Sequence, residues 1–126
     1  MDKQIINTSK APAPIGPYSQ AVKVAGLFFI SGQIAIEPSS SQLVMGNITE
    51  ETEQVMKNLQ AILESAEIDF SHVVKTTIFL SDMELFSEVN EVYSKYFDAE
   101  YPARETIAVK GLPKNVNVEI SMIASE

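Results

Sequence analysis

Apolar residues recur with a period of two in some segments and at helical spacing in others, and this change divides the chain into predicted elements. The segments 18–24 and 27–33 flank Ala25-Gly26, where glycine can take the positive φ of a tight turn, so they predict a β-hairpin. The segment 38–46, in which serines and a glutamine follow a proline, predicts a loop.

A first helix is predicted after this loop. Thr49 is its candidate N-cap, with Glu50, Glu51 and Glu53 as a solvated acidic group near the positive end of the helix. The apolar residues that follow form one stripe at helical spacing: Val55, Met56, Leu59, Ile62, Leu63 and Ala66.

A second helix is predicted to run to about Phe97. Ser81 and Glu84 have the spacing of a capping box at its start. Its apolar stripe comprises Phe86, Val89, Tyr93, Tyr96 and Phe97. Asn90 falls on the same stripe, so it is a candidate buried polar group that needs a hydrogen-bond partner.

The remaining patterned segments predict strands. Residues 73–80 are rich in β-branched side chains, and residues 106–109 and 116–124 predict a hairpin around the connection 110–115. The resulting order is β-β-β-α-β-α-β-β, in which the third strand, after the hairpin, is not assigned to particular residues. This order is typical of an α+β fold, a mixed sheet with two helices on one face. We expect a single domain, residues 1–126.

Arg104 is the only arginine of the chain, which has nine Lys and Arg residues in total. It follows Tyr101-Pro102-Ala103 at the start of a predicted strand. Because lysine supplies positive charge elsewhere, a lone guanidinium indicates a need for planar, two-pronged hydrogen bonding to a carboxylate or phosphate. A structural ion pair is the alternative.

The register of the predicted final hairpin follows from its apolar pattern. Pairing Val109 with Val116 places the apolar residues of both strands on the face toward the helices. The same register gathers four polar residues on the other face: Arg104, Thr106, Glu119 and Ser121. Glu119 lies within an apolar run, so it is either the partner of Arg104 in an ion pair or a carboxylate placed for proton transfer beside a substrate held by Arg104.

Composition excludes several kinds of chemistry. The net charge of −8 with scattered lysines argues against nucleic acid as a partner. The chain has no cysteine, and His72, its one histidine, is best explained as a capping or surface residue, so neither a thiol nucleophile nor a zinc cluster is expected. No signal-peptide core or membrane-spanning run occurs, and we expect a cytoplasmic protein without a membrane partner.

Short motifs spread over nearly the whole chain resemble those of the reactive intermediate deaminase family (Rid or YjgF, also called the translation inhibitor or L-PSP endoribonuclease family). The matching segments are Gly16-Pro17-Tyr18-Ser19-Gln20-Ala21, Ser31-Gly32-Gln33-Ile34, Asn90-Glu91-Val92-Tyr93, Pro102-Ala103-Arg104, Leu112-Pro113 and Val118-Glu119-Ile120. The segments from Pro102 onward resemble the enamine/imine deaminases in particular.

The resemblance implies a chorismate-mutase-like fold and a homotrimer with ligand clefts between subunits. It implies hydrolysis of 2-iminobutanoate and 2-iminopropanoate, released by pyridoxal-phosphate-dependent dehydratases, to 2-oxo acids and ammonia, with no cofactor and no metal. Two alternatives remain: a trimer that binds 2-oxo acids without turnover, and a ribonuclease or translation inhibitor, which the acidic charge makes the weaker of the two.

The resemblance also implies roles for particular residues. Arg104 corresponds to the residue that binds the substrate carboxylate, and Glu119 to the residue that orients the attacking water. The other substrate-binding positions are Tyr18, Ser31, Gly32, Asn90 and Pro113. Thr106 replaces a common cysteine whose role is largely that of its backbone carbonyl, and Glu105 replaces a small residue. Both departures could change substrate preference.

Overall fold

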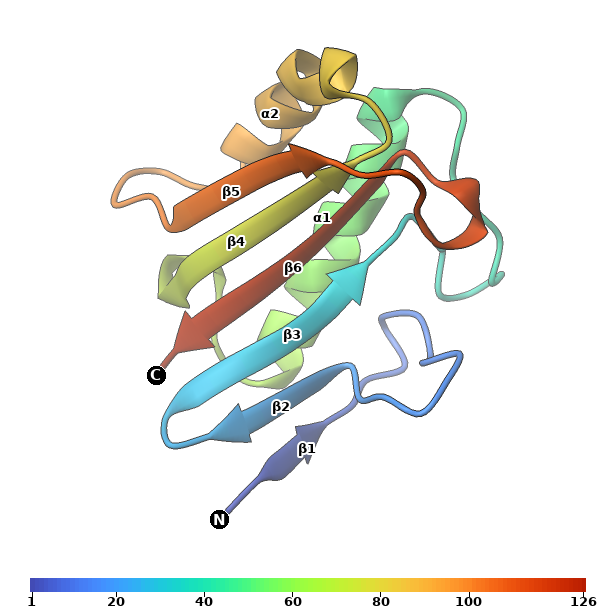
Figure 1. Ribbon diagram of the computed structural model, residues 1–126. Helices are drawn as coiled ribbons and strands as arrows, with labels where there is room; N and C mark the ends of the chain where they lie inside the picture. The colour runs from blue at the N-terminus through green and yellow to red at the C-terminus, as the bar shows by residue number, and fades with distance from the viewer.

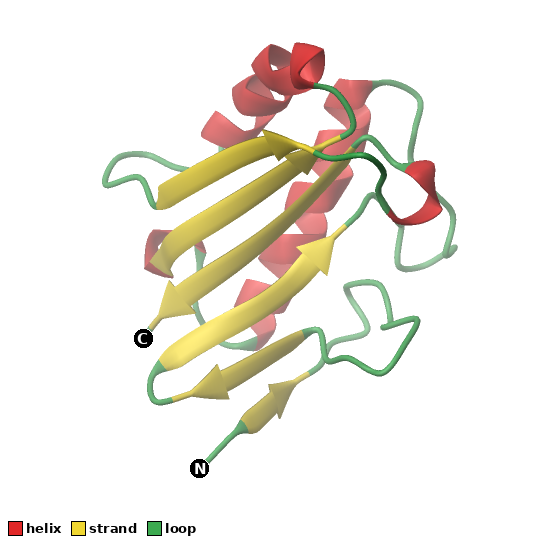
Figure 2. Ribbon diagram, in the orientation of Figure 1, coloured by secondary structure: helices red, strands yellow, loops and turns green.

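The structure is a computed structural model that describes residues 1–126, and it contains a mixed sheet with two helices on one face (Figures 1 and 2). The strands are β1 (Gln4–Ile6), β2 (Ala21–Val24), β3 (Leu27–Gln33), β4 (Val73–Leu80), β5 (Ala103–Ala108) and β6 (Val118–Ser125). The helices are α1 (Ile48–Ser65) and α2 (Phe86–Ser94), with 3₁₀ turns η1 (Phe70–His72), η2 (Met83–Leu85) and η3 (Pro113–Asn115). The sheet order is β1-β2-β3-β6-β4-β5.

The predicted order of strands and helices is confirmed, but the strand without assigned residues is β1, which precedes the hairpin and does not follow it. It pairs antiparallel with β2, which forms the predicted hairpin with β3. Both residues of the connecting turn take positive φ, 51° at Ala25 and 77° at Gly26. Two successive positive φ values define the turn that matches the twist of a hairpin, which explains the glycine.

The predicted helix starts need correction. The N-cap of α1 is Asn47 rather than Thr49, and its Oδ1 accepts a hydrogen bond of 2.8 Å from the backbone N–H of Glu50. The capping box at Ser81 does not form, because Asp82 caps η2 instead and α2 begins only at Phe86. The helix ends at Ser94, short of the predicted Phe97.

The predicted hairpin of the last two strands is wrong. The edge strand β5 runs parallel to β4, to which α2 provides the crossover, while β6 lies between β3 and β4 and is antiparallel to both (Figure 1). A β-α-β unit places its two strands in parallel, and here that connection prevails over pairing between sequence neighbours. Along β6 buried and half-buried residues alternate, as suits a strand with neighbours on both sides.

This topology also overturns the predicted polar patch. Arg104 pairs with Thr76 of β4, whose side chain is buried beneath the helices, so Arg104 and Thr106 lie on the helix face. Glu119 pairs with Phe79 and lies with Ser121 on the open face. The four residues are therefore divided between opposite faces of the sheet.

The core lies between the sheet and the helices. The predicted stripe of α1 is buried, including Val55, Met56 and Leu59, and it packs with buried side chains of the central strands such as Ile78 and Ile120. The opposite face of the sheet has no helix over it (Figure 2). No helix has the length and apolar content that crossing a membrane requires.

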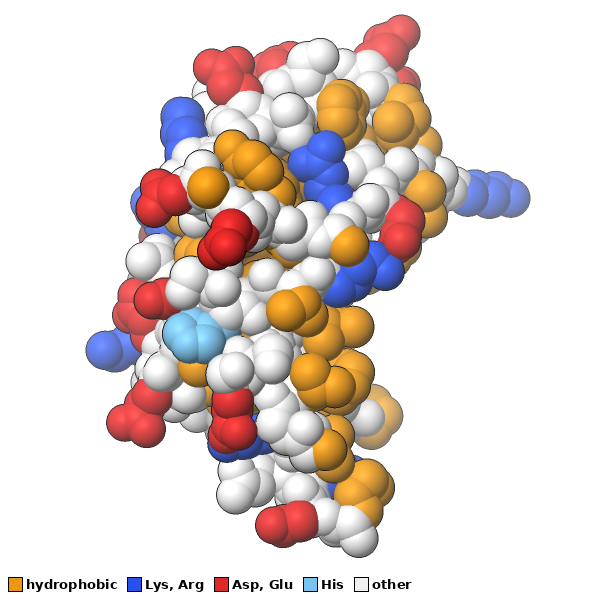
Figure 3. Space-filling view, turned by 90° about the vertical axis from the view of Figure 1, so that its left-hand side faces the viewer, with side chains coloured by type: hydrophobic (Ala, Val, Ile, Leu, Met, Phe, Trp, Pro, Cys, Tyr) orange, Lys and Arg blue, Asp and Glu red, His pale blue; other side chains and the backbone are white.

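The open face of the sheet carries apolar side chains from several strands. Exposed examples are Ile5, Leu27, Phe29 and Ile107. In Figure 3 hydrophobic side chains gather along the right-hand edge, where the open face is seen in profile. Contiguous apolar surface of this kind is uncommon on a face that only water covers.

Candidate active site

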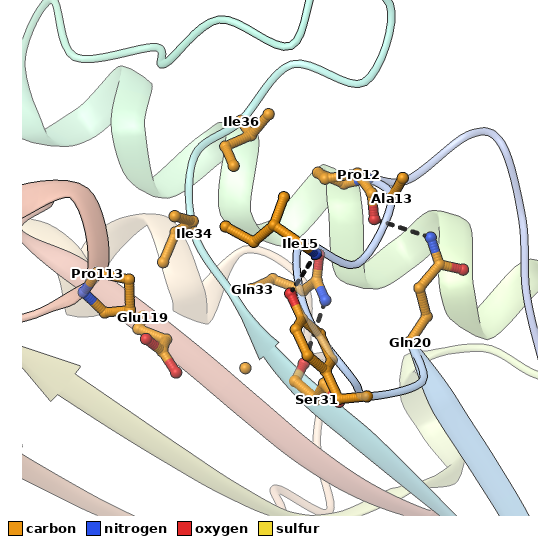
Figure 4. Close-up of a pocket in the computed structure, with 12 residues that line it drawn as sticks. Pro12, Ala13, Ile15, Gln20, Ser31, Gln33, Ile34, Ile36, Pro113 and Glu119 are labelled. Carbon is orange, nitrogen blue, oxygen red and sulfur yellow. Dashed lines mark hydrogen bonds between the residues drawn. The ribbon is translucent and has the colours of Figure 1, made fainter.

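A cavity of about 330 Å³ opens beside Glu119 (Figure 4). It is bounded by β3, the start of β6, the turn η3 and the loop before β2. Five of the predicted site residues line it: Tyr18, Ser31, Gly32, Pro113 and Glu119. Its other lining residues are mainly apolar or amide side chains: Pro12, Ala13, Ile15, Gln20, Gln33, Ile34 and Ile36.

Glu119 is the only carboxylate in the lining of this cavity, and Tyr18 is the only other titratable side chain there. The Glu119 side chain is half-buried, and this burial raises the pKa of its carboxyl above the usual value of 4.5. None of the hydrogen bonds or ion pairs within the chain offsets this desolvation. A carboxylate with a raised pKa and free oxygens is suited to accept a proton from water.

Gly32 leaves room for the Glu119 side chain. A Cβ at position 32 would lie 2.9 Å from Cδ of Glu119, closer than real Cβ atoms approach other heavy atoms. Only glycine allows the carboxylate to lie across β3 at this point. The sequence analysis assigned Gly32 to the site, and the structure supplies a steric reason for the glycine.

The loop wall of the cavity is held by Gln20, a residue that the sequence analysis did not assign. Its buried amide accepts a hydrogen bond of 2.7 Å from the N–H of Thr8 and donates to the carbonyls of Thr8 (3.0 Å) and Pro12 (2.9 Å). Ser31 Oγ donates to the carbonyl of Ser19 at 2.6 Å. Gln20 lies in the matching segment 16–21. It stands between polar Ser19 and apolar Ala21, and this pattern did not indicate that it is buried.

Arg104 lies elsewhere, on the helix face of β5. Its Nη1 donates a hydrogen bond of 2.7 Å to Oδ1 of Asn90, which provides the partner predicted for that amide, although Asn90 is half-buried and not buried as predicted. The guanidinium lies over the rings of Tyr93 and Phe86, 5.1 and 5.5 Å from their centroids. These contacts orient the guanidinium group and leave most of its N–H donors free.

A shallow groove of about 460 Å³ adjoins Arg104, lined by Asn90, Tyr93, Ser94, Tyr101, Pro102 and Arg104. Thr106 lines neither cavity. Its Oγ1 is buried without a hydrogen-bond partner, two residues beyond Arg104 on the same strand face. Within one chain the predicted site is therefore split into a Glu119 half, on the open face, and an Arg104 half, on the helix face. No group of three or more His, Asp or Glu side chains is arranged to hold a metal ion.

Comparison with known proteins agrees with the fold and the motifs. The family model described as Endoribonuclease L-PSP matches residues 8–126. The chain is 52% identical over 122 residues to the mouse protein named 2-iminobutanoate/2-iminopropanoate deaminase, covering 97% of this chain and 90% of that protein. The chain belongs to this family, which is the reactive intermediate deaminase family, and has its chorismate-mutase-like fold.

Two solved structures match almost end to end. The Rid-family protein YyfA from Yersinia pestis superimposes with a TM-score of 0.96 at 44% identity, covering 99% of this chain and 100% of that one. E. coli TdcF with bound serine superimposes with a TM-score of 0.93 at 36% identity, covering 98% of each chain.

Proposed function

We propose that the protein is a 2-iminobutanoate/2-iminopropanoate deaminase, which hydrolyses these imines to 2-oxo acids and ammonia. Membership of the family and the name of the 52% identical mouse relative support this function. The observation that carries it is Glu119, a half-buried carboxylate with a raised pKa and no partner, set over Gly32 in a small cavity. An imine needs one base-activated water, and this geometry can supply it.

The active unit is proposed to be a homotrimer with ligand clefts between subunits. Arg104 and Glu119 lie on opposite faces of the sheet, so one small substrate cannot contact both within one chain. Arg104 lies on an edge strand, from which it can approach the open face of a neighbouring copy. The exposed apolar side chains of that face favour such a contact.

In this cleft Arg104 binds the substrate carboxylate with two parallel hydrogen bonds. TdcF, whose structure contains bound serine, shows that a relative accommodates a small ligand with an α-carboxylate. Asn90 and the ring of Tyr93 hold the guanidinium in one plane. Charge-assisted contacts of this kind contribute about 1.5–3 kcal/mol each. Their main effect is to fix the imine carbon relative to the Glu119 half.

Glu119 then takes a proton from a water as the water oxygen bonds to the imine carbon, and it passes this proton to the imine nitrogen, which gives a neutral carbinolamine. Glu119 next takes the proton of the carbinolamine hydroxyl and transfers it to the amino nitrogen. The C–N bond breaks, the nitrogen leaves as ammonia, the carbonyl of the 2-oxo acid forms, and Glu119 is again a carboxylate. The backbone carbonyl of Thr106 is proposed as a second acceptor for the water. One positioned base supplies roughly 10²–10⁴ in rate, which is sufficient for a substrate that hydrolyses spontaneously.

The proposal includes a cytoplasmic location and no role for nucleic acid. The net charge of −8 opposes binding to a phosphate backbone. The older family name leaves ribonuclease activity as an outcome to test rather than a second proposal, since the cavity contains one carboxylate and no second catalytic base.

The decisive experiment follows 2-oxobutanoate and ammonia release from threonine dehydratase intermediates. Purified protein should accelerate imine hydrolysis, and Glu119→Gln should abolish most of the acceleration. A parent protein that binds 2-oxobutanoate without accelerating hydrolysis would instead indicate a non-catalytic 2-oxo acid sensor. RNA cleavage that co-purifies with the protein and disappears in Glu119→Gln would indicate a nuclease.

A further inference from the structure

Glu51, in the first turn of α1, is almost completely buried, with 1% of its surface exposed. Its carboxylate accepts three hydrogen bonds from the segment that precedes Glu119. Oε2 accepts from the backbone N–H of Asn117 at 2.7 Å and of Val118 at 3.2 Å, and Oε1 accepts from the Asn117 side-chain amide at 3.0 Å. The sequence analysis predicted that Glu51 belongs to a solvated acidic group, and for Glu51 this prediction is wrong.

The contacts of Glu51 are all with neutral N–H groups, and none of the ion pairs of the chain includes it. Burying a carboxylate without a cation is unfavourable unless directed donors satisfy its oxygens. Backbone donors have fixed positions, so a carboxylate that binds them fixes the position of the backbone around Asn117 and Val118. An ion pair between flexible surface side chains does not have this effect. The arrangement favours a positional role for Glu51.

The segment that Glu51 holds carries two site residues. Val118 is directly followed by Glu119, and Pro113 opens the turn η3 just before Asn117. Lys114 and Asn115 in this turn both have φ of 55°, an uncommon conformation for residues other than glycine. The segment thus needs an external anchor to keep Pro113 and Glu119 at the cavity.

Asn117 extends the contact to Ser81, the residue that follows the neighbouring strand β4. Its backbone carbonyl accepts a hydrogen bond of 2.9 Å from the N–H of Ser81, and its Oδ1 accepts one of 3.0 Å from the Ser81 hydroxyl. Ser81 directly follows β4 and precedes the segment that leads into α2, which carries Asn90. One hydrogen-bonded chain, Glu51–Asn117–Ser81, thus joins the start of α1 to segments that lead into both halves of the site.

We propose that Glu51 is a positioning residue of the active site, which acts by holding the 113–118 segment so that Glu119 and Pro113 face the cavity. The proposal rests on the proposed deaminase function for its kinetic consequence, but the tether itself can be measured independently. The proposal predicts that removing the hydrogen bonds of Glu51 lowers the rate of the chemical step. The binding of the substrate carboxylate should not weaken, because Arg104 lies on another strand.

The test compares Glu51→Leu with Thr52→Val. Leucine removes all three hydrogen bonds, whereas glutamine would keep a carbonyl oxygen that can accept from both backbone N–H groups. Thr52 is the next residue, is also buried, and its Oγ1 donates to the Ile48 carbonyl at 2.7 Å inside α1, without a hydrogen bond to β6. Both variants remove hydrogen bonding at the same buried helix turn. Because a misplacement of about 1 Å can cost roughly 10² in rate, kcat of Glu51→Leu should fall at least about tenfold. Its KM should stay within about threefold, and Thr52→Val should retain the parent kcat at a similar melting temperature.

Hydrogen exchange at the Asn117 and Val118 amides provides the readout that needs no activity. Both amides should exchange at least about tenfold faster in Glu51→Leu than in the parent or in Thr52→Val. A Glu51→Leu protein with parental kcat would overturn the proposal even if these amides exchange faster. Unchanged exchange would overturn it too, whether or not the parent hydrolyses imines. If the parent does not hydrolyse imines, the proposed function fails, and the pKa of Glu119 measured by carboxyl NMR replaces kcat as the readout. An unchanged Glu119 pKa in Glu51→Leu would then overturn the positioning role.

Should Glu51→Leu fail to fold, Asn117→Ala gives the second test. It removes only the 3.0 Å bond to Oε1 and the side-chain contact with Ser81, while both backbone N–H bonds to Glu51 remain. The same fall in kcat at constant KM is expected, smaller than for Glu51→Leu. Ser65→Ala, an exposed substitution that removes a hydrogen bond to the Ile62 carbonyl within α1, is the matched surface control.

Discussion

Gly32 lies against the Glu119 side chain so closely that a Cβ at position 32 would approach Cδ of Glu119 to 2.9 Å. The two residues belong to adjacent strands, β3 and β6, at the point where the register between these strands shifts. A shift of this kind re-aims side chains, and here it accompanies the approach of a carboxylate to a glycine. The position of Glu119 therefore depends on the absence of a side chain at residue 32.

Gly32→Ala should displace the Glu119 carboxylate and lower kcat/KM for imine hydrolysis by about tenfold to 10²-fold. The backbone of Gly32 does not have positive φ, so alanine is compatible with the fold there. Gly111→Ala is the matched control, because a Cβ at Gly111 meets no atom within 4 Å and its φ is not positive. If both variants keep parental activity while circular dichroism shows intact folds, the placement of Glu119 is not critical.

Arg104→Lys tests the need for a planar fork. Lysine keeps the charge but cannot form two parallel hydrogen bonds with a carboxylate, and it loses the stacking over Tyr93 and Phe86. We expect KM to rise and kcat/KM to fall at least about tenfold. Lys110→Arg, at an exposed position, controls for the exchange itself. If Arg104→Lys has the parental kcat/KM, Arg104 is only a structural partner of Asn90 and does not bind the substrate carboxylate.

The sequence was sufficient to predict those features that depend on neighbouring residues. The bounds of β3 and β4 and the buried stripe of α1 follow from the period of the apolar residues. This period depends only on which face of the element is buried. The pairing of β5 could not be obtained in this way. Its apolar alternation fits an antiparallel partner as well as a parallel one, and the choice depends on α2 acting as a crossover.

The sequence did not predict how the candidate site residues are arranged. Five residues that the motif resemblance selected line one cavity, but the predicted hairpin register placed Arg104 and Glu119 on one face, whereas the sheet separates them. Glu51 shows a further limit. In the sequence it resembles Glu50 and Glu53, and only the packing of α1 against the start of β6 distinguishes a buried anchor from exposed or half-buried charges.

Assembly should depend on the open face of the sheet. Phe29, 42% exposed on β3, pairs with Val22 and Ile123 on this face. Phe29→Glu would place a charge in the proposed subunit contact, so light scattering at micromolar concentration should report a mass near one chain instead of three. Gln60→Glu introduces the same charge on the exposed side of α1 and should leave the trimer intact. A monomeric parent would exclude the intersubunit cleft.

Glu119→Gln separates catalysis from binding. The amide keeps the shape of the side chain but cannot accept a proton, so imine hydrolysis should fall by at least about 10² while 2-oxobutanoate binds within several-fold of the parent. Calorimetry for binding and coupled release of ammonia for turnover measure the two effects separately. Hydrolysis at the parental rate would show that Glu119 is not the base.

The same variant tests the environment of the carboxyl through pH. Burial raises the pKa of Glu119 above 4.5 in the folded protein, so between the unfolded and folded pKa values the native state binds more protons than the unfolded state. The stability of the parent should therefore fall as pH rises through that window, and Glu119→Gln should lack this contribution. Its melting temperature relative to the parent should increase from about pH 4 to about pH 8. In the parent, kcat/KM should decline with acidification through the same raised pKa, since only the carboxylate accepts a proton. A melting-temperature difference that does not change with pH would mean that the carboxyl is solvated, and the case for Glu119 as a tuned base would fail.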